Sequence, residues 1–388
     1  MTSSRLDVLL REIDLPARAY ELAERRYEDL SEWMGRPKSR LATYDTHMFV
    51  QGSFALGTPI RPVNDGDEYD LDFSCKLRQG VSRQTHTQEQ LKHMVGLELE
   101  DYREARQIMH PLEPKNRCWR LAYRDELPFH MDIVPGLRTN QYERQVLGER
   151  MTLRGVPEQL AQDIAGRSLW ITDRQHPHFR TLSSDWPSSN PGGYQLWFRS
   201  RMQSLIKRLF AEAEIDPLPV YRSKTPLQQA VQLLKRHRDV MFAQNPDLKP
   251  VSIILTTIAG GAYEHGEDLQ ASMRRILRAF EAVRLSDADE ILNPVNPQEN
   301  FADRWTRPDC VRLELKRHFH EWIRQAQRDF AHILAATQAQ VLVEVAEDAF
   351  QVRVLKDAFH PFVASSAPTV PRRVTLSSEP ARPWREWG

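Results

Sequence analysis

Residues 68–73, with the sequence EYDLDF, decide the fold because acidic and apolar side chains alternate along them. Alternation with a period of two predicts a β-strand that turns one face to a core and the other away from it. Leu71 and Phe73 are then buried, while Asp70 and Asp72 project together from the opposite face. Two carboxylates held this close repel each other, and a bound divalent cation is the usual compensation.

Residues 130–135, with the sequence HMDIVP, predict a second strand of the same kind. Met131 and Ile133 face one side of it, and His130 and Asp132 face the other. If the two strands pair, three carboxylates converge. Such a set can hold two metal ions about 3.5–4 Å apart, the arrangement used for in-line displacement at phosphorus.

A Gly-Ser pair in residues 51–54, QGSF, supplies a complementary feature. Gly52 lets a phosphate approach the backbone, and Ser53 at the start of a helix offers its hydroxyl and backbone N–H groups. An isolated Asp-x-Asp strand is most often a solvated face. Here Asp70 follows Ser53 by 17 positions and a third aspartate follows later, so the pattern favours a phosphate-transfer site.

Composition indicates a soluble globular protein without a dominant polyanionic partner. The 388 residues are 40% hydrophobic and 27% charged, with 53 basic and 53 acidic side chains. Three cysteines without a CxxC pair give no disulfide framework or cysteine zinc site. The N-terminal residues lack a signal-peptide core, and the longest apolar stretch, residues 253–262, is shorter than the roughly 20 residues that span a bilayer. We therefore expect no membrane anchor and a cytoplasmic location.

Apolar periodicity predicts a strand-rich part followed by a helical part. A helix is expected over residues 16–34 and another over 84–110, with strands at 69–75, 117–123 and 129–134. Residues 186–194 are interpreted as a loop at the lobe boundary. Further helices are expected around residues 198–210, 227–234, 269–283 and 319–333.

These elements predict four segments. They are an N-terminal helical segment spanning the lobes (1–40), a catalytic core (41–185), a helical lobe (186–345) and a flexible tail (364–388).

The Gly-Ser pair, the Asp-x-Asp strand and the later aspartate resemble those of the polymerase-beta-like nucleotidyltransferases. More narrowly, the chain resembles the bacterial cyclic-oligonucleotide synthases of anti-phage systems, which are relatives of cyclic GMP-AMP synthase. That match also rests on residues 224–239, 251–255 and 293–305, and it spans roughly residues 45–335. It implies an α+β, two-lobed fold, with a mixed sheet in the catalytic lobe and a helical lobe beside it.

The resemblance assigns roles to individual residues. It implies that Asp70, Asp72 and Asp132 are catalytic and hold two Mg²⁺ ions, for which Mn²⁺ can substitute. Lys235 also belongs to a polar stripe on a predicted helix, where it faces either a cleft or solvent, and Ser252 is either a phosphate contact or a helix N-cap. The expected nucleotide-binding residues are Gln51, Gly52, Ser53, Lys235 and Ser252.

The implied activity is synthesis of a cyclic di- or trinucleotide messenger from nucleoside triphosphates, ATP among them, in anti-phage defence. A ribose hydroxyl attacks an α-phosphate, pyrophosphate leaves, and a second attack closes the ring. Two other functions remain open at this point. One is transfer of nucleotides to RNA or protein, and the other is a non-catalytic nucleotide-binding module.

Two further features bear on partners. The pairs His176/His178 and His318/His320 have no cysteine or carboxylate at zinc spacing, so no zinc module and no DNA requirement are indicated. The chain ends in Gly388, which would suit conjugation by a ubiquitin-transfer-like enzyme, although an ordinary disordered end is the alternative.

Overall fold

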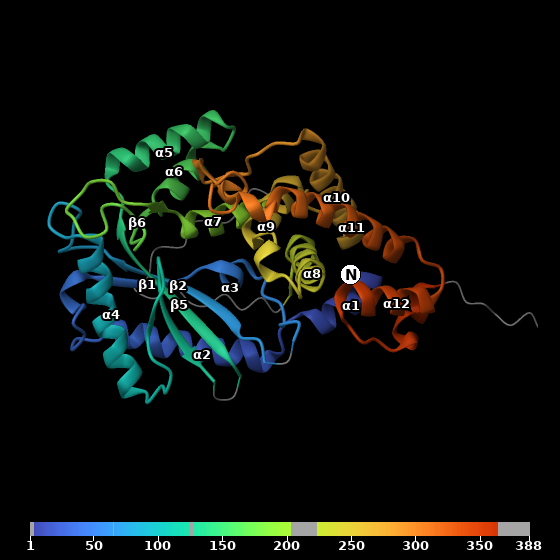
Figure 1. The fold of residues 1–388 in the computed structure, drawn as a ribbon, viewed down its shortest axis with the longest axis horizontal. Helices are drawn as coiled ribbons and strands as arrows, with labels where there is room; N and C mark the ends of the chain where they lie inside the picture. Colours follow the sequence, from blue (N-terminus) through green and yellow to red (C-terminus); the bar gives the residue numbers. More distant parts are fainter. Residues whose placement is uncertain (1–3, 65, 125–126, 203–222, 364–388) are drawn as a thin grey trace, which may run out of the picture.

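The computed structural model describes residues 4–64, 66–124, 127–202 and 223–363. Within them a sheet covered by helices lies beside a group of helices (Figure 1). The predicted helix around residues 198–210 is described only as far as Met202, and the predicted tail with Gly388 lies outside the described residues. In these ranges no helix is both long and apolar enough to cross a membrane.

The sheet is mixed, as the sequence predicted. Its central strands β2 (Tyr69–Leu77) and β5 (Phe129–Arg138) are parallel, and the other pairs are antiparallel. Their order is β1-β2-β5-β4-β3. In addition, β6 pairs with the C-terminal end of β5, and β7 pairs with β6. The remaining bounds are β1 Thr46–Val50, β3 Glu113–Pro114, β4 Trp119–Tyr123, β6 Leu169–Ile171 and β7 Ser188–Ser189.

The register of the central strands aligns the polar positions. Asp70 lies opposite His130, and Asp72 lies opposite Asp132. On the other side of β5, Arg120 of β4 is the partner of Asp132. Alternation along both strands therefore places all of these polar side chains on one face of the sheet.

Helices α2 (Ala17–Gly35) and α4 (Gln88–Ala105) cover the opposite face. Phe73 is fully buried there, and its ring stacks on Tyr27 of α2 with centroids 5.0 Å apart. Helix α4 is shorter than predicted because Thr87 caps it, accepting a hydrogen bond from the Gln90 N–H. The chain beyond its end adopts a positive φ at Gln107.

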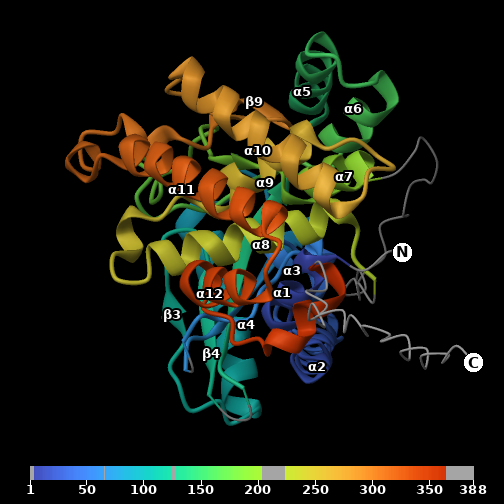
Figure 2. The same ribbon diagram turned by 90° about the vertical axis from the view of Figure 1, so that its right-hand side faces the viewer.

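The helical part packs around α8 (Pro226–Met241), α10 (Leu269–Ser286) and α11 (Leu315–Ala335), which lie close together in Figure 2. These confirm three of the predicted helices. Further helices that contribute to this core are α5 (Gln141–Leu153), α6 (Glu158–Ala165), α7 (Pro191–Met202), α9 (Ser252–Ala262) and α12 (Ala339–Phe350). Helices α5 and α6 precede residue 186 yet contribute to this core, and the division at residue 186 stays a prediction.

The prediction of a loop over residues 186–194 is partly wrong, because α7 begins at Pro191. The Asn190 side chain accepts a hydrogen bond from the Gly193 N–H (2.9 Å) and donates one to the Ile164 carbonyl (2.9 Å). A Cβ at Gly193 would lie 2.4 Å from that side chain. The glycine therefore makes room for the Asn190 contact in the first turn of a helix rather than marking a loop.

The N-terminal helices contact both parts of the molecule. Buried residues of α1 (Arg5–Ile13) belong to the helical core, whereas those of α2 belong to the core beneath the sheet. Asp14 at the joint accepts hydrogen bonds from Gln232 of α8 (3.0 Å) and Tyr20 of α2 (3.2 Å), and it pairs with Lys224. The two parts are thus tied together at the junction of α1 and α2.

Replacing Phe73 with alanine should strongly destabilise the protein, because its ring is fully buried and stacked on Tyr27. We expect a loss of about 3–5 kcal/mol in the free energy of unfolding, measured by urea denaturation. The control is Tyr142→Ala, since that side chain is 74% exposed and its loss should change stability by less than about 0.5 kcal/mol. Equal effects of the two substitutions would contradict the packing described.

Candidate functional site

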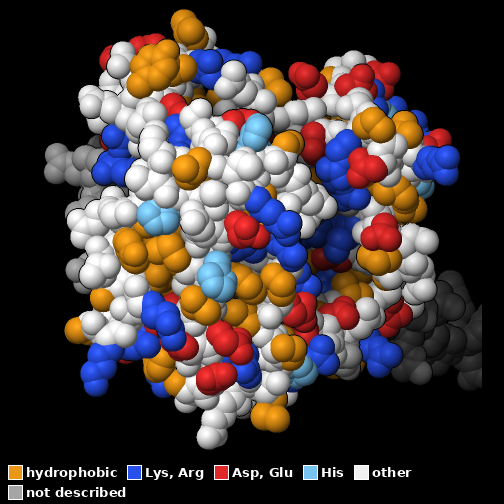
Figure 3. Space-filling model, turned by 60° about the vertical axis from the view of Figure 1, so that its left-hand side comes forward, with side chains coloured by type: hydrophobic (Ala, Val, Ile, Leu, Met, Phe, Trp, Pro, Cys, Tyr) orange, Lys and Arg blue, Asp and Glu red, His pale blue; other side chains and the backbone are white. Residues whose placement is uncertain are grey.

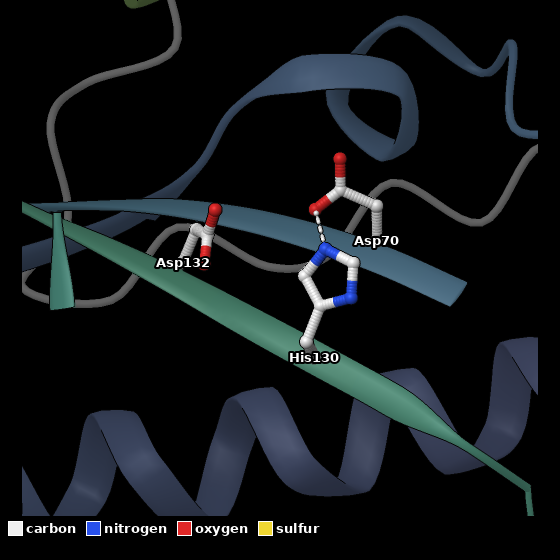
Figure 4. Close-up of side chains that lie close together, drawn as sticks. All are labelled: Asp70, His130 and Asp132. Carbon is white, nitrogen blue, oxygen red and sulfur yellow. Dashed lines mark ion pairs between the residues drawn. The ribbon is translucent and has the colours of Figure 1, made fainter. Parts of the chain in front are cut away.

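Three side chains meet on the face of the sheet opposite α2. Asp70 projects from β2, and His130 and Asp132 project from β5 (Figure 4). The His130 Nε2 lies 3.0 Å from Asp70 Oδ1. One ligand atom from each of the three residues lies within 4.8 Å of the others, a spacing that could hold a metal ion. The structure thus brings two of the three predicted aspartates together with a histidine.

Asp132 forms a bidentate ion pair with Arg120 of β4. The Arg120 Nε donates to Asp132 Oδ1 and Nη2 donates to Oδ2, both over 2.7 Å. These hydrogen bonds raise the pKa of Arg120 above its ordinary value, so the guanidinium stays charged. A carboxylate has about four lone-pair positions, and both oxygens of Asp132 therefore keep capacity for a further ligand.

Asp72 lies beside the group rather than within it, because its carboxylate is turned toward Gly52. A Cβ on Gly52 would lie 2.0 Å from Asp72 Oδ2. Burial raises the pKa of Asp72 well above its ordinary value, and the neighbouring charges of Asp70 and Asp132 raise it further. Three carboxylates in one place are therefore electrostatically unfavourable without a compensating cation.

The turn from β1 into α3 (Gly52–Leu56) brings the Gly-Ser pair beside these carboxylates. The backbone N–H of Gln51 donates to the Asp72 carbonyl over 2.8 Å. The Gln51 amide donates to the Phe73 carbonyl (3.3 Å) and accepts from Ser74 (3.0 Å), so the Gln51 side chain holds the turn against β2. Gly52 is exposed with φ +64°, a conformation that favours glycine.

His130 is a candidate functional residue that the sequence pattern did not predict. Its Nδ1 lies 3.1 Å from Glu68 Oε2, and Nε2 faces Asp70. Burial lowers the pKa of His130, but the hydrogen bond and charge of Asp70 outweigh it, and the pKa is raised overall. Its position two residues before Asp132, on the same strand face, is the sequence feature from which a role for His130 could have been predicted.

Lys235 lies neither on a solvated face nor free in a cleft. It is 7% exposed, and its Nζ donates to the Thr58 carbonyl over 2.8 Å. Burial and the nearby Arg238 lower the pKa of Lys235 to about 8. Gln228 and Gln232 lie on the same polar stripe of α8 and hold the end of α3 and the chain after it, since Gln228 donates to the Leu56 carbonyl and Gln232 to that of Pro59.

Ser252 is the first residue of α9, and Val251 occupies the N-cap position. The N-cap alternative for Ser252 is therefore wrong. Its hydroxyl instead accepts a hydrogen bond from Arg238 Nη1 over 2.8 Å. Arg238 also pairs with Asp239 (2.6 Å), so Ser252 of α9 contacts a charged cluster of α8 that lies one turn from Lys235.

Residues 46–135 match the protein family described as cyclic GMP-AMP synthase DncV-like, nucleotidyltransferase domain. The chain is also similar to the c-di-GMP synthase of Roseivirga ehrenbergii, with 29% identity over 318 residues, 80% of this chain and 73% of that protein. The cyclic dinucleotide synthase CdnG of Bradyrhizobium diazoefficiens is 26% identical over 330 residues, covering 81% and 74% of the two chains.

Solved structures share the fold. CdnG of Bradyrhizobium diazoefficiens in complex with GTP gives a TM-score of 0.62 at 23% identity, covering 89% of this chain and 94% of that chain. CdnC of E. coli MS115-1 with ATP gives a TM-score of 0.56 at 16% identity, covering 90% and 97%. The Vibrio cholerae dinucleotide cyclase DncV gives 0.57 at 13% identity, covering 91% and 96%.

Gly52→Ala should destabilise the protein because of the positive φ and the close Asp72 carboxylate. We expect a loss of about 1–3 kcal/mol in unfolding free energy. Gly35→Ala is the control, because no atom lies within 4 Å of a Cβ at Gly35. A Gly52 variant as stable as the Gly35 variant would show that the turn differs from the one described.

Asp72→Asn should raise the thermal midpoint at about pH 7.5 in the presence of EDTA, because a half-buried negative charge beside two other carboxylates is removed. The raised pKa of Asp72 means that the wild-type protein loses stability as pH rises through that pKa. The advantage of the variant should therefore shrink as the pH falls toward about 4, where the wild-type carboxyl is also neutral. An advantage that grows toward low pH would contradict this sign.

Proposed function

We propose that this chain is a nucleotidyltransferase of the DncV-like family that joins nucleoside triphosphates into a cyclic dinucleotide, because residues 46–135 match that domain and the chain is similar to two cyclic dinucleotide synthases. One observation carries the proposal. The parallel register of β2 and β5 gathers Asp70, Asp72, Asp132 and His130 on one face, directly beside the Gly52-Ser53 turn. Carboxylates beside an exposed glycine suit nucleotidyl transfer.

Asp70 and Asp132 fit a divalent ion by donor chemistry, since hard cations prefer carboxylate oxygens. We assign Mg²⁺ to this position, with Mn²⁺ as a substitute and Asp72 as a further ligand to the pair of ions expected from the sequence. When bound, such ions bring the attacking hydroxyl to the α-phosphate and neutralise the developing charge. Arg120 holds the Asp132 carboxylate in place on this face through two hydrogen bonds.

The triphosphate is assigned to the Gly52-Ser53 turn. Gly52 is exposed and carries no side chain that would block a phosphate, and the Ser53 hydroxyl lies next to it on α3. Lys235 holds the Thr58 carbonyl in the segment that follows, and its pKa is sensitive to the Asp70 charge. We propose that Lys235 and the cluster containing Ser252 supply positive charge to the donor phosphates from the side of α8.

A mononucleotide acceptor is favoured over RNA or protein. The face shown in Figure 3 carries acidic as well as basic side chains, and the chain has 53 of each, whereas a polymer acceptor favours a continuous basic track. The relative named c-di-GMP synthase supports GTP as a substrate beside the ATP expected from the sequence. A cytoplasmic location, a role in anti-phage defence and conjugation through Gly388 stay predictions from the sequence.

Incubation with the four ribonucleoside triphosphates and Mg²⁺ or Mn²⁺ tests the proposal. We expect a phosphatase-resistant cyclic product by mass spectrometry, with GMP in the ring. Asp70→Ala and Asp132→Ala should each lower the rate by on the order of 10²-fold or more, because charge stabilisation at the phosphate is lost.

The control is Asp348→Ala, which removes an exposed carboxylate on α12 and should leave the rate unchanged. A product that persists in the Asp70 and Asp132 variants would place the chemistry elsewhere. A phosphatase-sensitive linear chain, or label transferred to RNA or protein, would contradict the cyclic dinucleotide assignment.

A further inference from the structure

We propose that His130 is itself a ligand of the divalent ion, through Nε2, and that Glu68 positions it. The ion would then be held by one nitrogen and the carboxylate oxygens of Asp70 and Asp132, rather than by aspartates alone. This inference rests on the proposed metal-dependent transfer only in placing an ion on this face of the sheet. It concerns the ligand set and not the product.

The two sides of the imidazole ring are used differently. Glu68 Oε2 lies 3.1 Å from Nδ1, and Arg124 holds the other oxygen of Glu68 over 3.2 Å. A carboxylate that accepts from one ring nitrogen fixes the orientation of the ring and leaves the other nitrogen for a metal. In His130 that other nitrogen, Nε2, points to the group containing Asp70 and Asp132 (Figure 4).

The distances fit a shared ion. Ligand atoms about 2.1 Å from a metal lie about 3 Å apart when adjacent and about 4.2 Å apart when opposite. His130 Nε2 and Asp70 Oδ1 are 3.0 Å apart, which is a hydrogen bond in the ion-free protein and is also the separation of adjacent ligands once an ion replaces the Nε2 proton. The full group lies within 4.8 Å, so a small rotation of the half-exposed Asp70 side chain closes it around an ion.

The strand register explains why His130, rather than Asp72, lies beside Asp70. His130 pairs with Asp70, and Asp72 pairs with Asp132, across the parallel strands. Asp72 turns its carboxylate to Gly52, and His130 lies beside Asp70. The two carboxylates still offer the oxygen donors that Mg²⁺ prefers, and the added nitrogen raises the affinity of the site for Mn²⁺ relative to Mg²⁺.

The test is electron spin echo spectroscopy of the full-length protein loaded with Mn²⁺ alone, without nucleotide. We expect a coupling between the Mn²⁺ electron spin and an imidazole nitrogen, and its loss in His130→Ala. Glu68→Gln should keep the coupling but weaken Mn²⁺ binding by about 10- to 100-fold, as partners of metal-bound histidines do. Titration should show tighter binding of Mn²⁺ than of Mg²⁺ in the wild type and a smaller difference in His130→Ala.

The control is His265→Ala, because His265 is an exposed histidine outside the sheet and its loss should leave coupling and affinity unchanged. Bound Mn²⁺ without nitrogen coupling, or no Mn²⁺ bound at all, overturns the inference. Nitrogen coupling in a protein that makes no cyclic product would overturn the proposed function and leave the ligand assignment standing. Formation of the cyclic product without nitrogen coupling would overturn the ligand assignment and leave the proposed function standing.

Discussion

The parallel pairing of β2 with β5 is the constraint on which the site depends. Parallel strands align residues in register, and here that register places His130 beside Asp70 and Asp132 beside Asp72. A shift of one residue would turn Asp132 toward α2 and α4, into a core that contains Phe73 and Ile133. The hydrophobic packing beneath the sheet therefore determines which carboxylates meet above it.

A second constraint is the set of hydrogen bonds that joins the helical part to the sheet. The polar stripe of α8 contacts backbone carbonyls of residues 56–59, directly after the Gly-Ser turn. Buried amide and ammonium groups need such partners, because an unpaired polar group in the interior costs about 1–3 kcal/mol. The same bonds that satisfy α8 also fix the turn beside Asp72. Stability and site geometry thus share one set of hydrogen bonds.

The strands of the site and their buried faces were predictable, because alternation in residues 68–73 and 130–135 is unambiguous. The mixed sheet and the three helices α8, α10 and α11 followed from periodicity and resemblance. The loop over 186–194 was partly wrong because a Gly-Gly pair also occurs where a side chain, here that of Asn190, needs space inside a helix.

Side-chain partners were less predictable. The roles of Gln51 and Lys235 depend on carbonyls that only folding brings near, those of Phe73 and Thr58. His130 was visible on the right strand face, but its Glu68 partner lies 62 positions away in sequence and could not be paired without the register. Periodicity places a residue on a face, and it does not say which neighbour that residue meets.

The most direct test is a crystal structure with Mn²⁺ and a non-hydrolysable analogue of GTP, with the ion located by anomalous scattering. An anomalous peak between Asp70, Asp132 and His130, with the triphosphate over Gly52 and Ser53, is the result that the shared register of β2 and β5 predicts. An ion or a triphosphate bound away from this face of the sheet would contradict it.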